Sequence, residues 1–192
     1  RDLPSNVKGR VTMPKAAKEA GCLVLGIVTR PFTFEGKSRR LNALEGINTL
    51  MKTVDALIVV SNDKLMFNNG GMSIKEAFAC SDMVLASSVK TVTDLILLHG
   101  IINLDFADVK TIMRETGSAL MGIGRAAGEK RASEAAKMAI SSPLLETSIE
   151  GARGVLLNIT GGTNLGLFEV NEAAEIISAA ADPEANIIFG AV

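Results

Sequence analysis

The chain has 192 residues, of which 47% are hydrophobic and 21% are charged, and its formal net charge is −1. This composition favours a folded globular protein over a disordered chain, and the length allows one large domain or two small ones. No apolar run approaches the roughly 20 residues that a membrane-spanning helix needs, and the first six residues contain no apolar core of a secretory signal. Lys and Arg are scattered, and Trp and Tyr are absent, which argues against a nucleic-acid-binding surface.

Cysteine and histidine are scarce. Cys22 and Cys80 stand in apolar or helical contexts, so we expect two buried free thiols and a reducing compartment. His99 is the sole histidine, which excludes a multi-histidine zinc site. It falls in the last turn of a predicted helix, where we expect it to face solvent.

Hydrophobic periodicity predicts alternating strands and helices. Continuous apolar runs indicate strands buried on both faces, and apolar residues three or four apart indicate helices. In chain order we expect an irregular lead-in over residues 1–12, the end of a helix over 15–21 that Gly21 stops, a strand at 23–28, a helix at 36–53, a strand at 56–60, a long helix at 73–98, a helix at 105–115, a short strand at 118–124 that runs into a glycine turn, a helix at 131–140, a strand at 154–160, a helix at 169–180 and a strand at 186–190.

The first two strands and the helix between them predict a parallel pair with a right-handed crossover. Ligands of such sheets bind beyond the carboxyl ends of the strands. Those ends are here residues 29–35 and 61–63. A ligand pocket is therefore expected at this edge.

The long helix is expected to connect two functional regions. Ser73 and Glu76 fit a capping box at its start, and its apolar residues leave so little polar face that we expect it to be largely buried. At 1.5 Å per residue it would be roughly 37 Å long. Its start adjoins the predicted pocket and its end leads to residues 103–108, so we expect the pocket and this loop on opposite sides of the molecule.

Asp105 and Asp108 stand three apart at a predicted helix start. Asp is a strong N-cap residue, and a carboxylate at the third helical position can meet the free N–H groups of the first turn. Two interpretations stay open: the pair caps the helix, or it orients a water molecule on a phosphate of another molecule. Residues 122–128 leave a similar choice between glycine turn geometry and phosphate binding, although their spacing is not that of a dinucleotide-binding turn.

Five side chains fall at the predicted strand ends or at the start of the long helix: Glu35, Arg39, Asn62, Phe78 and Asp82. Taken singly, they suit a surface ion pair four residues apart, a core phenylalanine and a solvated acid. Taken together, they offer an aromatic face, a carboxylate able to accept ring N–H donors, an amide and polar groups for a ribose. This convergence suits a purine nucleoside.

Several longer motifs occur in order between residues 15 and 192. They are VTRPFTFEGK (28–37), NDKL (62–65), NLDFADV (103–109), AISSPLLE (139–146), GARGVL (151–156) and NITGG (158–162). Together they resemble the FtsZ family of bacterial cell-division GTPases, which are relatives of tubulin. The resemblance implies an α/β fold: a partial Rossmann-like GTPase domain with parallel strands, a long central helix, and a second α/β domain with a mixed sheet.

The resemblance implies a guanine-nucleotide site that uses the five side chains above. Glu35 and Arg39 would contact the ribose side, Phe78 would stack near the base, Asp82 would recognise it, and Asn62 would lie close by. GTP or GDP is the implied ligand, with Mg²⁺.

The resemblance also implies that Asn103, Asp105 and Asp108 form the family's hydrolysis loop. This loop would enter the nucleotide pocket of the neighbouring subunit, where the carboxylates would orient the attacking water while Mg²⁺ and backbone dipoles stabilise the phosphoryl charge. A head-to-tail contact that does not close generates a filament, so self-association is implied, together with division-ring partners and a cytoplasmic location at the division site.

Two parts of the family pattern are not matched. Its glycine-rich phosphate loops should precede residue 15, where residues 4–12 read PSNVKGRVT, and its last strands and tail should follow residue 192. We therefore expect a partial chain divided into residues 1–72 (the end of the nucleotide domain), 73–102 (the central helix) and 103–192 (the hydrolysis loop and second domain).

Two functions follow from this resemblance. The first is a tubulin-like GTP-binding protein of cytokinesis whose GTP is hydrolysed at subunit interfaces, with no GTP turnover expected from this chain alone. The alternative is a truncated, non-catalytic assembly module that caps or modulates filaments.

Overall fold

The structure is a computed structural model, and it describes residues 5–66, 71–97, 105–114, 116–142, 144–145 and 147–191. Its contacts divide the chain into two compact units: Arg1–Ser87 with Met113–Ala119 form unit 1, and Ser88–Ile112 with Leu120–Val192 form unit 2. The helix α4 (Ile74–Leu97) contributes residues to both. The strands described form two sheets, and helices accompany each of them, so the expected α/β class is confirmed.

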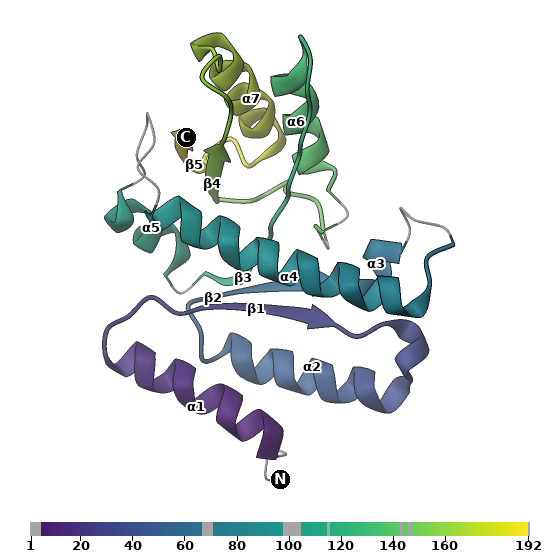
Figure 1. Cartoon of the computed structure of the whole chain (residues 1–192). Helices are drawn as coiled ribbons and strands as arrows, with labels where there is room; N and C mark the ends of the chain where they lie inside the picture. The colour runs from purple at the N-terminus through teal and green to yellow at the C-terminus, as the bar shows by residue number, and fades with distance from the viewer. Residues whose placement is uncertain are drawn as a thin grey trace. The chain divides into compact units, whose positions relative to one another are not determined.

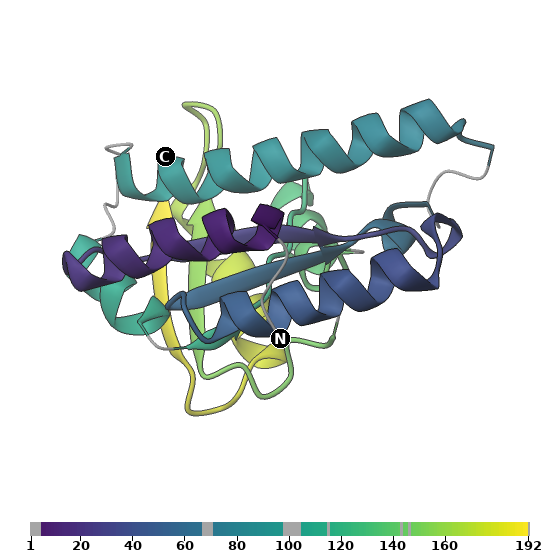
Figure 2. The same ribbon diagram turned by 90° about the horizontal axis from the view of Figure 1, so that it is seen from below.

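Unit 1 contains a three-stranded parallel sheet in the order β1–β2–β3, formed by Leu25–Arg30, Ala56–Ser61 and Gly117–Ala119. Leu25 pairs with Ala56, and Ala56 pairs with Gly117. The helices α1 (Ser5–Glu19) and α2 (Lys37–Met51) lie on one face of this sheet (Figures 1 and 2). Two short segments follow the carboxyl ends of β1 and β2: the 3₁₀ turn η1 (Thr33–Glu35) and the helix α3 (Asn62–Met66).

A buried carboxylate fastens α1 to this sheet. Asp55, only 2% exposed, precedes β2 and accepts a hydrogen bond from the Val24 N–H through Oδ2 at 2.9 Å. Its Oδ1 lies 3.2 Å from Lys18 Nζ. Because a buried acceptor must be satisfied, this pairing ties the end of α1 to the starts of β1 and β2.

Unit 2 contains a second sheet, in which β4 (Gly154–Ile159) pairs in parallel with β5 (Asn186–Ala191). The helices α6 (Arg131–Ile140) and α7 (Leu167–Ala180) pack together through Ala136, Ala173 and Ile177, against apolar residues of β4. The helix α5 (Phe106–Met113) buries Val109. The resemblance implied a mixed sheet in this part of the chain; the two strands that the structure describes here pair in parallel, and α7 forms the crossover between them.

One expectation about secondary structure is wrong, and one strand is shorter than expected. Residues 5–12 belong to α1 rather than to an irregular lead-in, and Pro14 lies inside this helix, although proline usually ends or kinks one. The helical end expected from residue 15 is confirmed. Gly21 does stop α1, with φ +80° and hydrogen bonds from the Gly21 and Cys22 N–H groups to the Lys18 and Ala17 carbonyls. The short strand expected before the glycine turn is the three-residue β3, Gly117–Ala119, and the glycines at 122 and 124 approach α6 closely.

Two expectations about burial are also wrong. In α4 the side chains of Ile74, Met83 and Leu97 are each 66% exposed, so this helix is not largely buried. Its apolar pattern indicates a preference for burial, but it does not supply a covering surface. Cys22 is exposed and Cys80 is half-buried, and both are free thiols. No described helix is both long and apolar enough to cross a membrane.

Candidate functional site

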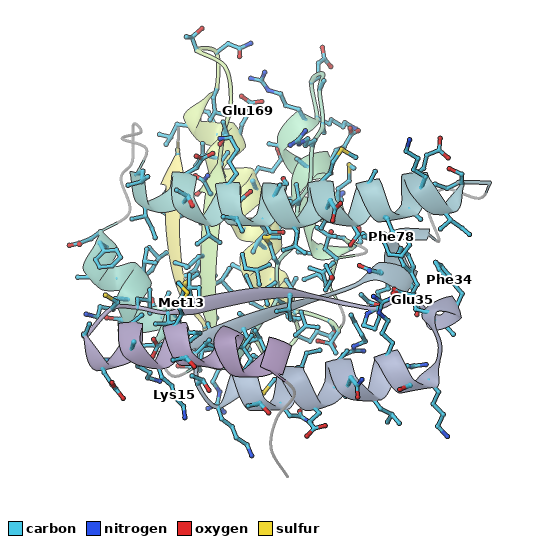
Figure 3. All side chains as sticks on the ribbon, turned by 60° about the horizontal axis from the view of Figure 1, so that its bottom comes forward. Met13, Lys15, Phe34, Glu35, Phe78 and Glu169 are labelled. Carbon is cyan, nitrogen blue, oxygen red and sulfur yellow. The ribbon has the colours of Figure 1, made fainter. Side chains whose placement is uncertain are left out.

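Three phenylalanines gather at the carboxyl end of β1, and Figure 3 labels two of them, Phe34 and Phe78. Phe32 stacks on Phe34 with ring centroids 5.0 Å apart, and Phe78 from α4 meets Phe32 edge-on at 5.2 Å. Phe32 is 1% exposed, whereas Phe34 and Phe78 are 53% and 39% exposed. A buried ring therefore supports two rings whose surfaces stay open to a ligand. Aromatic pairs of this geometry stabilise by about 0.5–1.5 kcal/mol beyond the area that they bury.

Glu35 lies beside these rings with both oxygens engaged. Its Oε1 accepts a hydrogen bond from the Phe32 N–H at 2.9 Å, and its Oε2 lies 2.9 Å from Arg39 Nη1. The Glu35 side chain is 9% exposed and that of Arg39 is 71% exposed. The carboxylate thus fixes the turn after β1, and the guanidinium extends into solvent one helical turn further on.

The carboxyl end of β2 supplies an amide and a second carboxylate. Asn62 is 4% exposed and its Oδ1 accepts a hydrogen bond from Ser81 Oγ on α4 at 2.8 Å. Asp63 accepts two hydrogen bonds from Thr33, one from its N–H at 2.8 Å and one from its hydroxyl at 2.6 Å. These bonds join the ends of β1, β2 and the first turns of α4 within unit 1.

The start of α4 has the capping box that the sequence predicted. The Ser73 N–H donates to Glu76 Oε2 at 2.7 Å, and the Glu76 N–H donates to Ser73 Oγ at 3.3 Å. Hydrogen bonds from Ser73 lower the pKa of the Glu76 carboxyl below its usual value. Four residues after Phe78, Asp82 is exposed on this helix.

Of the five expected nucleoside-site residues, contacts join Glu35 to Arg39, Asn62 to α4, and Phe78 to the turn that carries Glu35. Sequence reasoning missed Phe32, Phe34, Thr33, Asp63 and Ser81 as parts of this cluster. The first four lie in residues 29–35 and 61–63, the strand ends at which the sequence already predicted a ligand pocket. Their aromatic and polar side chains were the signal that could have identified them. Ser81 had no local signature, because a serine inside a helix is common.

The acidic pair at the start of α5 is described in part, since Asn103 lies outside the described residues. Asp105 caps the helix: its Oδ1 accepts the Ala107 N–H at 2.9 Å. Asp108 lies in the first turn, and both side chains are exposed. The capping interpretation is confirmed for Asp105, and the catalytic role of the pair stays a prediction.

The glycines at 122–128 have a packing role. An added Cβ would lie 2.1 Å from the Ala139 carbonyl oxygen at Gly122, and 1.8 Å from that of Ala135 at Gly124. Of the three glycines in this segment, Gly128 alone has a positive φ, at +100°. Close approach to α6 therefore explains the first two glycines better than the turn geometry or the phosphate binding that the sequence left open.

A second charged cluster holds the starts of α6 and α7 together in unit 2. Arg131 Nε and Nη2 lie 2.6 Å and 2.9 Å from the two carboxylate oxygens of Glu169, and the guanidinium also donates to Asn164. The bidentate bond from Arg131 and the Gly166 N–H lower the pKa of Glu169 to about 2, and Glu169 raises the pKa of Arg131. This cluster fixes the loop between β4 and α7.

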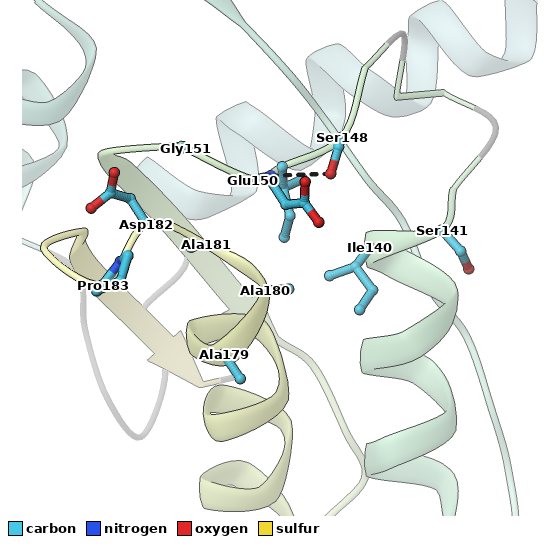
Figure 4. Close-up of a pocket in the computed structure, with 11 residues that line it drawn as sticks. Ile140, Ser141, Ser148, Glu150, Gly151, Ala179, Ala180, Ala181, Asp182 and Pro183 are labelled. Carbon is cyan, nitrogen blue, oxygen red and sulfur yellow. Dashed lines mark hydrogen bonds between the residues drawn. The ribbon is translucent and has the colours of Figure 1, made fainter.

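The ends of the same two helices border a shallow groove of about 530 Å³ (Figure 4). Ile140 and Ala179–Ala181 line it together with Glu150 and Asp182. Its polar groups stabilise turns, because Ser148 Oγ accepts the Glu150 N–H and Asp182 Oδ1 accepts the Glu184 N–H. None of the expected site residues lines this groove.

No group of three or more His, Cys, Asp or Glu side chains within the described ranges could hold a metal ion. The described side chains therefore do not form a site that could bind Mg²⁺ through protein ligands alone. Mg²⁺ commonly binds through one or two carboxylates and the phosphates of a nucleotide, so any such ion would depend on the ligand.

The two parallel sheets, with aromatic and polar side chains at the carboxyl edge of one, define an α/β protein of the type that binds ligands at strand ends. Two family models match it: "Tubulin/FtsZ family, GTPase domain" over residues 10–69 and "FtsZ family, C-terminal domain" over residues 117–192. They cover separate parts of the chain in the family's order. The chain belongs to the tubulin/FtsZ family.

Solved structures agree with this assignment. An FtsZ dimer from M. jannaschii is 42% identical, with a TM-score of 0.92 over 97% of this chain and 54% of the other. A mutant of that FtsZ matches equally over 97% and 56%. CetZ1 from Haloferax volcanii, described as a GDP-bound monomer, shares the fold at 20% identity, with a TM-score of 0.74 over 96% of this chain and 56% of that one. The chain spans about half the length of these structures.

Proposed function

We propose that this chain supplies the base and ribose side of a guanine-nucleotide site in a self-associating, tubulin-like GTPase of cell division. The observation that carries the proposal is the cluster at the ends of β1 and β2. Its exposed rings, Phe34 and Phe78, lie beside Glu35 and next to the helix turn that carries Asp82. A ring face stacks on a base. The exposed carboxylate of Asp82 can accept the N–H donors of the guanine ring, which adenine lacks at the same edge.

Nucleotide binding tests this proposal directly. Isothermal titration calorimetry with unlabelled GDP and ADP measures this binding and leaves the ribose hydroxyls unmodified. Removing one stacked ring costs about 1–3 kcal/mol, so Phe78→Ala should raise Kd about tenfold. Asp82→Ala should raise it for GDP and leave weak ADP binding unchanged. The matched control is Phe168→Ala in unit 2, which removes a phenylalanine that is 92% exposed. Equal Kd values for the wild type and the three variants would refute the proposal.

Hydrolysis and assembly form the second part of the proposal. Asp105 and Asp108 would act on the nucleotide of a neighbouring copy, with Asn103 in the same loop, and head-to-tail contacts would give filaments. Two features support this. The first is that both carboxylates are exposed at a capped helix start. The second is the length of α4, which has 24 residues and is therefore about 36 Å long. This helix carries Phe78 and Asp82 in its first turns, whereas the loop follows its other end in the sequence. Bound Mg²⁺ would stabilise charge on the phosphates.

This second part is tested with the 42% identical M. jannaschii protein. The chain alone should not turn over GTP. If its loop acts in trans, adding it to a hydrolysis-loop mutant of that protein should restore some phosphate release, and Asp105→Ala or Asp108→Ala should abolish the effect. Robust turnover by the chain alone would contradict the proposal.

The alternative function is a non-catalytic module that caps or modulates filaments. The exposed Asp105 and Asp108 would then form a contact face only. Sedimentation of M. jannaschii filaments with and without this chain separates the two functions. Substoichiometric shortening without phosphate release favours the capping module, and restored hydrolysis in the mutant favours the first function.

A further inference from the structure

The buried hydrogen bond between Ser81 and Asn62 determines which side of an amide a ligand would meet. The serine hydroxyl lies 2.8 Å from the amide oxygen, and both residues are 4% exposed. A helical serine ordinarily donates to the carbonyl four residues earlier or to solvent. Here the bond spans 19 residues and joins α4 to the first residue of α3.

An asparagine amide has one acceptor side and one donor side. Because Ser81 occupies the oxygen, the Asn62 N–H groups are left for a partner beyond the strand end. Within the described chain, the neighbouring groups at this end are already assigned: Asp63 accepts from Thr33, and Glu35 accepts from Phe32 and pairs with Arg39. The Asn62 amide donor is thus a polar group at the end of β2 that can meet a ligand.

We infer that Ser81 is a positioning residue that holds the Asn62 amide so that it donates to an acceptor oxygen of the bound nucleoside. This inference rests on the proposed function, since it concerns the same site. The acceptor has two sources, the base carbonyl or a ribose hydroxyl oxygen. With alanine at position 81 the amide can rotate by 180°, and it then presents donor and acceptor sides with similar frequency.

The test compares guanosine with 2-aminopurine riboside, which lacks the base carbonyl, and with 2′-deoxyguanosine and 3′-deoxyguanosine, each of which lacks one ribose hydroxyl. Loss of a well-oriented hydrogen bond costs about threefold to tenfold in affinity. Ser81→Ala should therefore weaken guanosine binding by that factor and leave unchanged the analogue that lacks the contacted oxygen. Ser87→Ala, on the same helix and also in unit 1, controls for loss of a helical hydroxyl. An equal loss for all four ligands would mean a purely structural role and would overturn the inference.

A second measurement needs no ligand. In the free protein, the Asn62 side-chain NH₂ protons should give weak nuclear Overhauser effects to the Ser81 β-protons, because the amide oxygen faces Ser81. Strong effects would show the nitrogen facing Ser81 and would refute the inference even if guanosine binds. If the amide is oriented as inferred but no variant or wild-type protein binds guanosine, the proposed function fails, and with it the role in binding.

Discussion

Replacing Gly124 by alanine should destabilise unit 2, because the added methyl group would clash with the backbone of α6. The new Cβ would lie 1.8 Å from the Ala135 carbonyl oxygen and 2.8 Å from its carbon. Carbon and carbonyl oxygen normally approach no closer than roughly 3.3 Å. The segment must therefore move about 1.5 Å away from α6, because a helix carbonyl cannot rotate aside as a flexible side chain can.

Overpacking of this kind costs about 1–3 kcal/mol, and the rigidity of both partners places Gly124→Ala at about 3 kcal/mol. The free energy of unfolding is measured by urea titration followed by far-UV circular dichroism. With an m-value of about 2 kcal/mol per M for a small unit, the midpoint should fall by about 1.5 M. Hydrogen exchange should show the loss in unit 2.

Gly46→Ala provides the matched control. Gly46 lies within α2, and its added Cβ meets no heavy atom within 4 Å. Alanine in a helix interior is favoured over glycine by up to about 1 kcal/mol, so this variant should be slightly more stable than wild type. If Gly124→Ala shifted the midpoint by less than about 0.3 M, the close approach to α6 would not be what requires glycine.

Three further predictions concern the buried acid, the charged cluster and the thiols. Asp55→Ala should lower the free energy of unfolding by about 2–3 kcal/mol, because it leaves the Val24 N–H without its acceptor. Lys18→Met removes the 39% exposed partner of Asp55 and should lower it by less than about 1 kcal/mol. Equal urea midpoints for the two variants would contradict this. The pKa of Glu169 is about 2 in the folded protein, below that of an unfolded glutamate, so its ion pair stabilises above about pH 4.5 and that contribution is lost as the pH falls towards 2. Thermal unfolding of Glu169→Gln should therefore differ most from wild type near neutral pH and converge with it in acid; a constant difference would refute the ion-pair explanation. Cys22 is exposed and Cys80 half-buried, so Ellman's reagent should label Cys22 first, and the variant Cys22→Ser should lose the fast phase.

The sequence predicted most elements because apolar periodicity acts locally. The strands at 154–159 and 186–191 and the helix at 131–140 fall within one residue of their expected bounds. The weak apolar pattern of residues 1–12 hid the first part of α1, which tolerates Pro14 in its interior and has Lys18 near its end paired with Asp55. The exposed face of α4 could not be foreseen, since a pattern shows which side chains favour burial but not what covers them.

The candidate site, like the fold, could be predicted from the sequence only in part. The rule that ligands bind at strand ends brought Glu35, Asn62 and Phe78 into one hypothesis, and contacts do connect their elements. Ser81 was missed, because its importance comes from a partner 19 residues away. Gly122 and Gly124 were misread for a related reason: their neighbour is a helix that begins at Arg131, and no spacing rule within the segment points to it.

The pairing of β3 with β2 sets an order of events during synthesis. Ala56 pairs with Gly117, so the outer strand of the first sheet is translated about 60 residues after its neighbour. At roughly 5–20 residues per second, this interval lasts about 3–12 s. For that time β2 has one open edge on the ribosome while α4 and α5 are being made, and unit 1 can close only when the chain has already begun unit 2. Slowing translation between codons 61 and 117 should therefore prolong the period in which the nascent chain binds chaperones that recognise open strand edges.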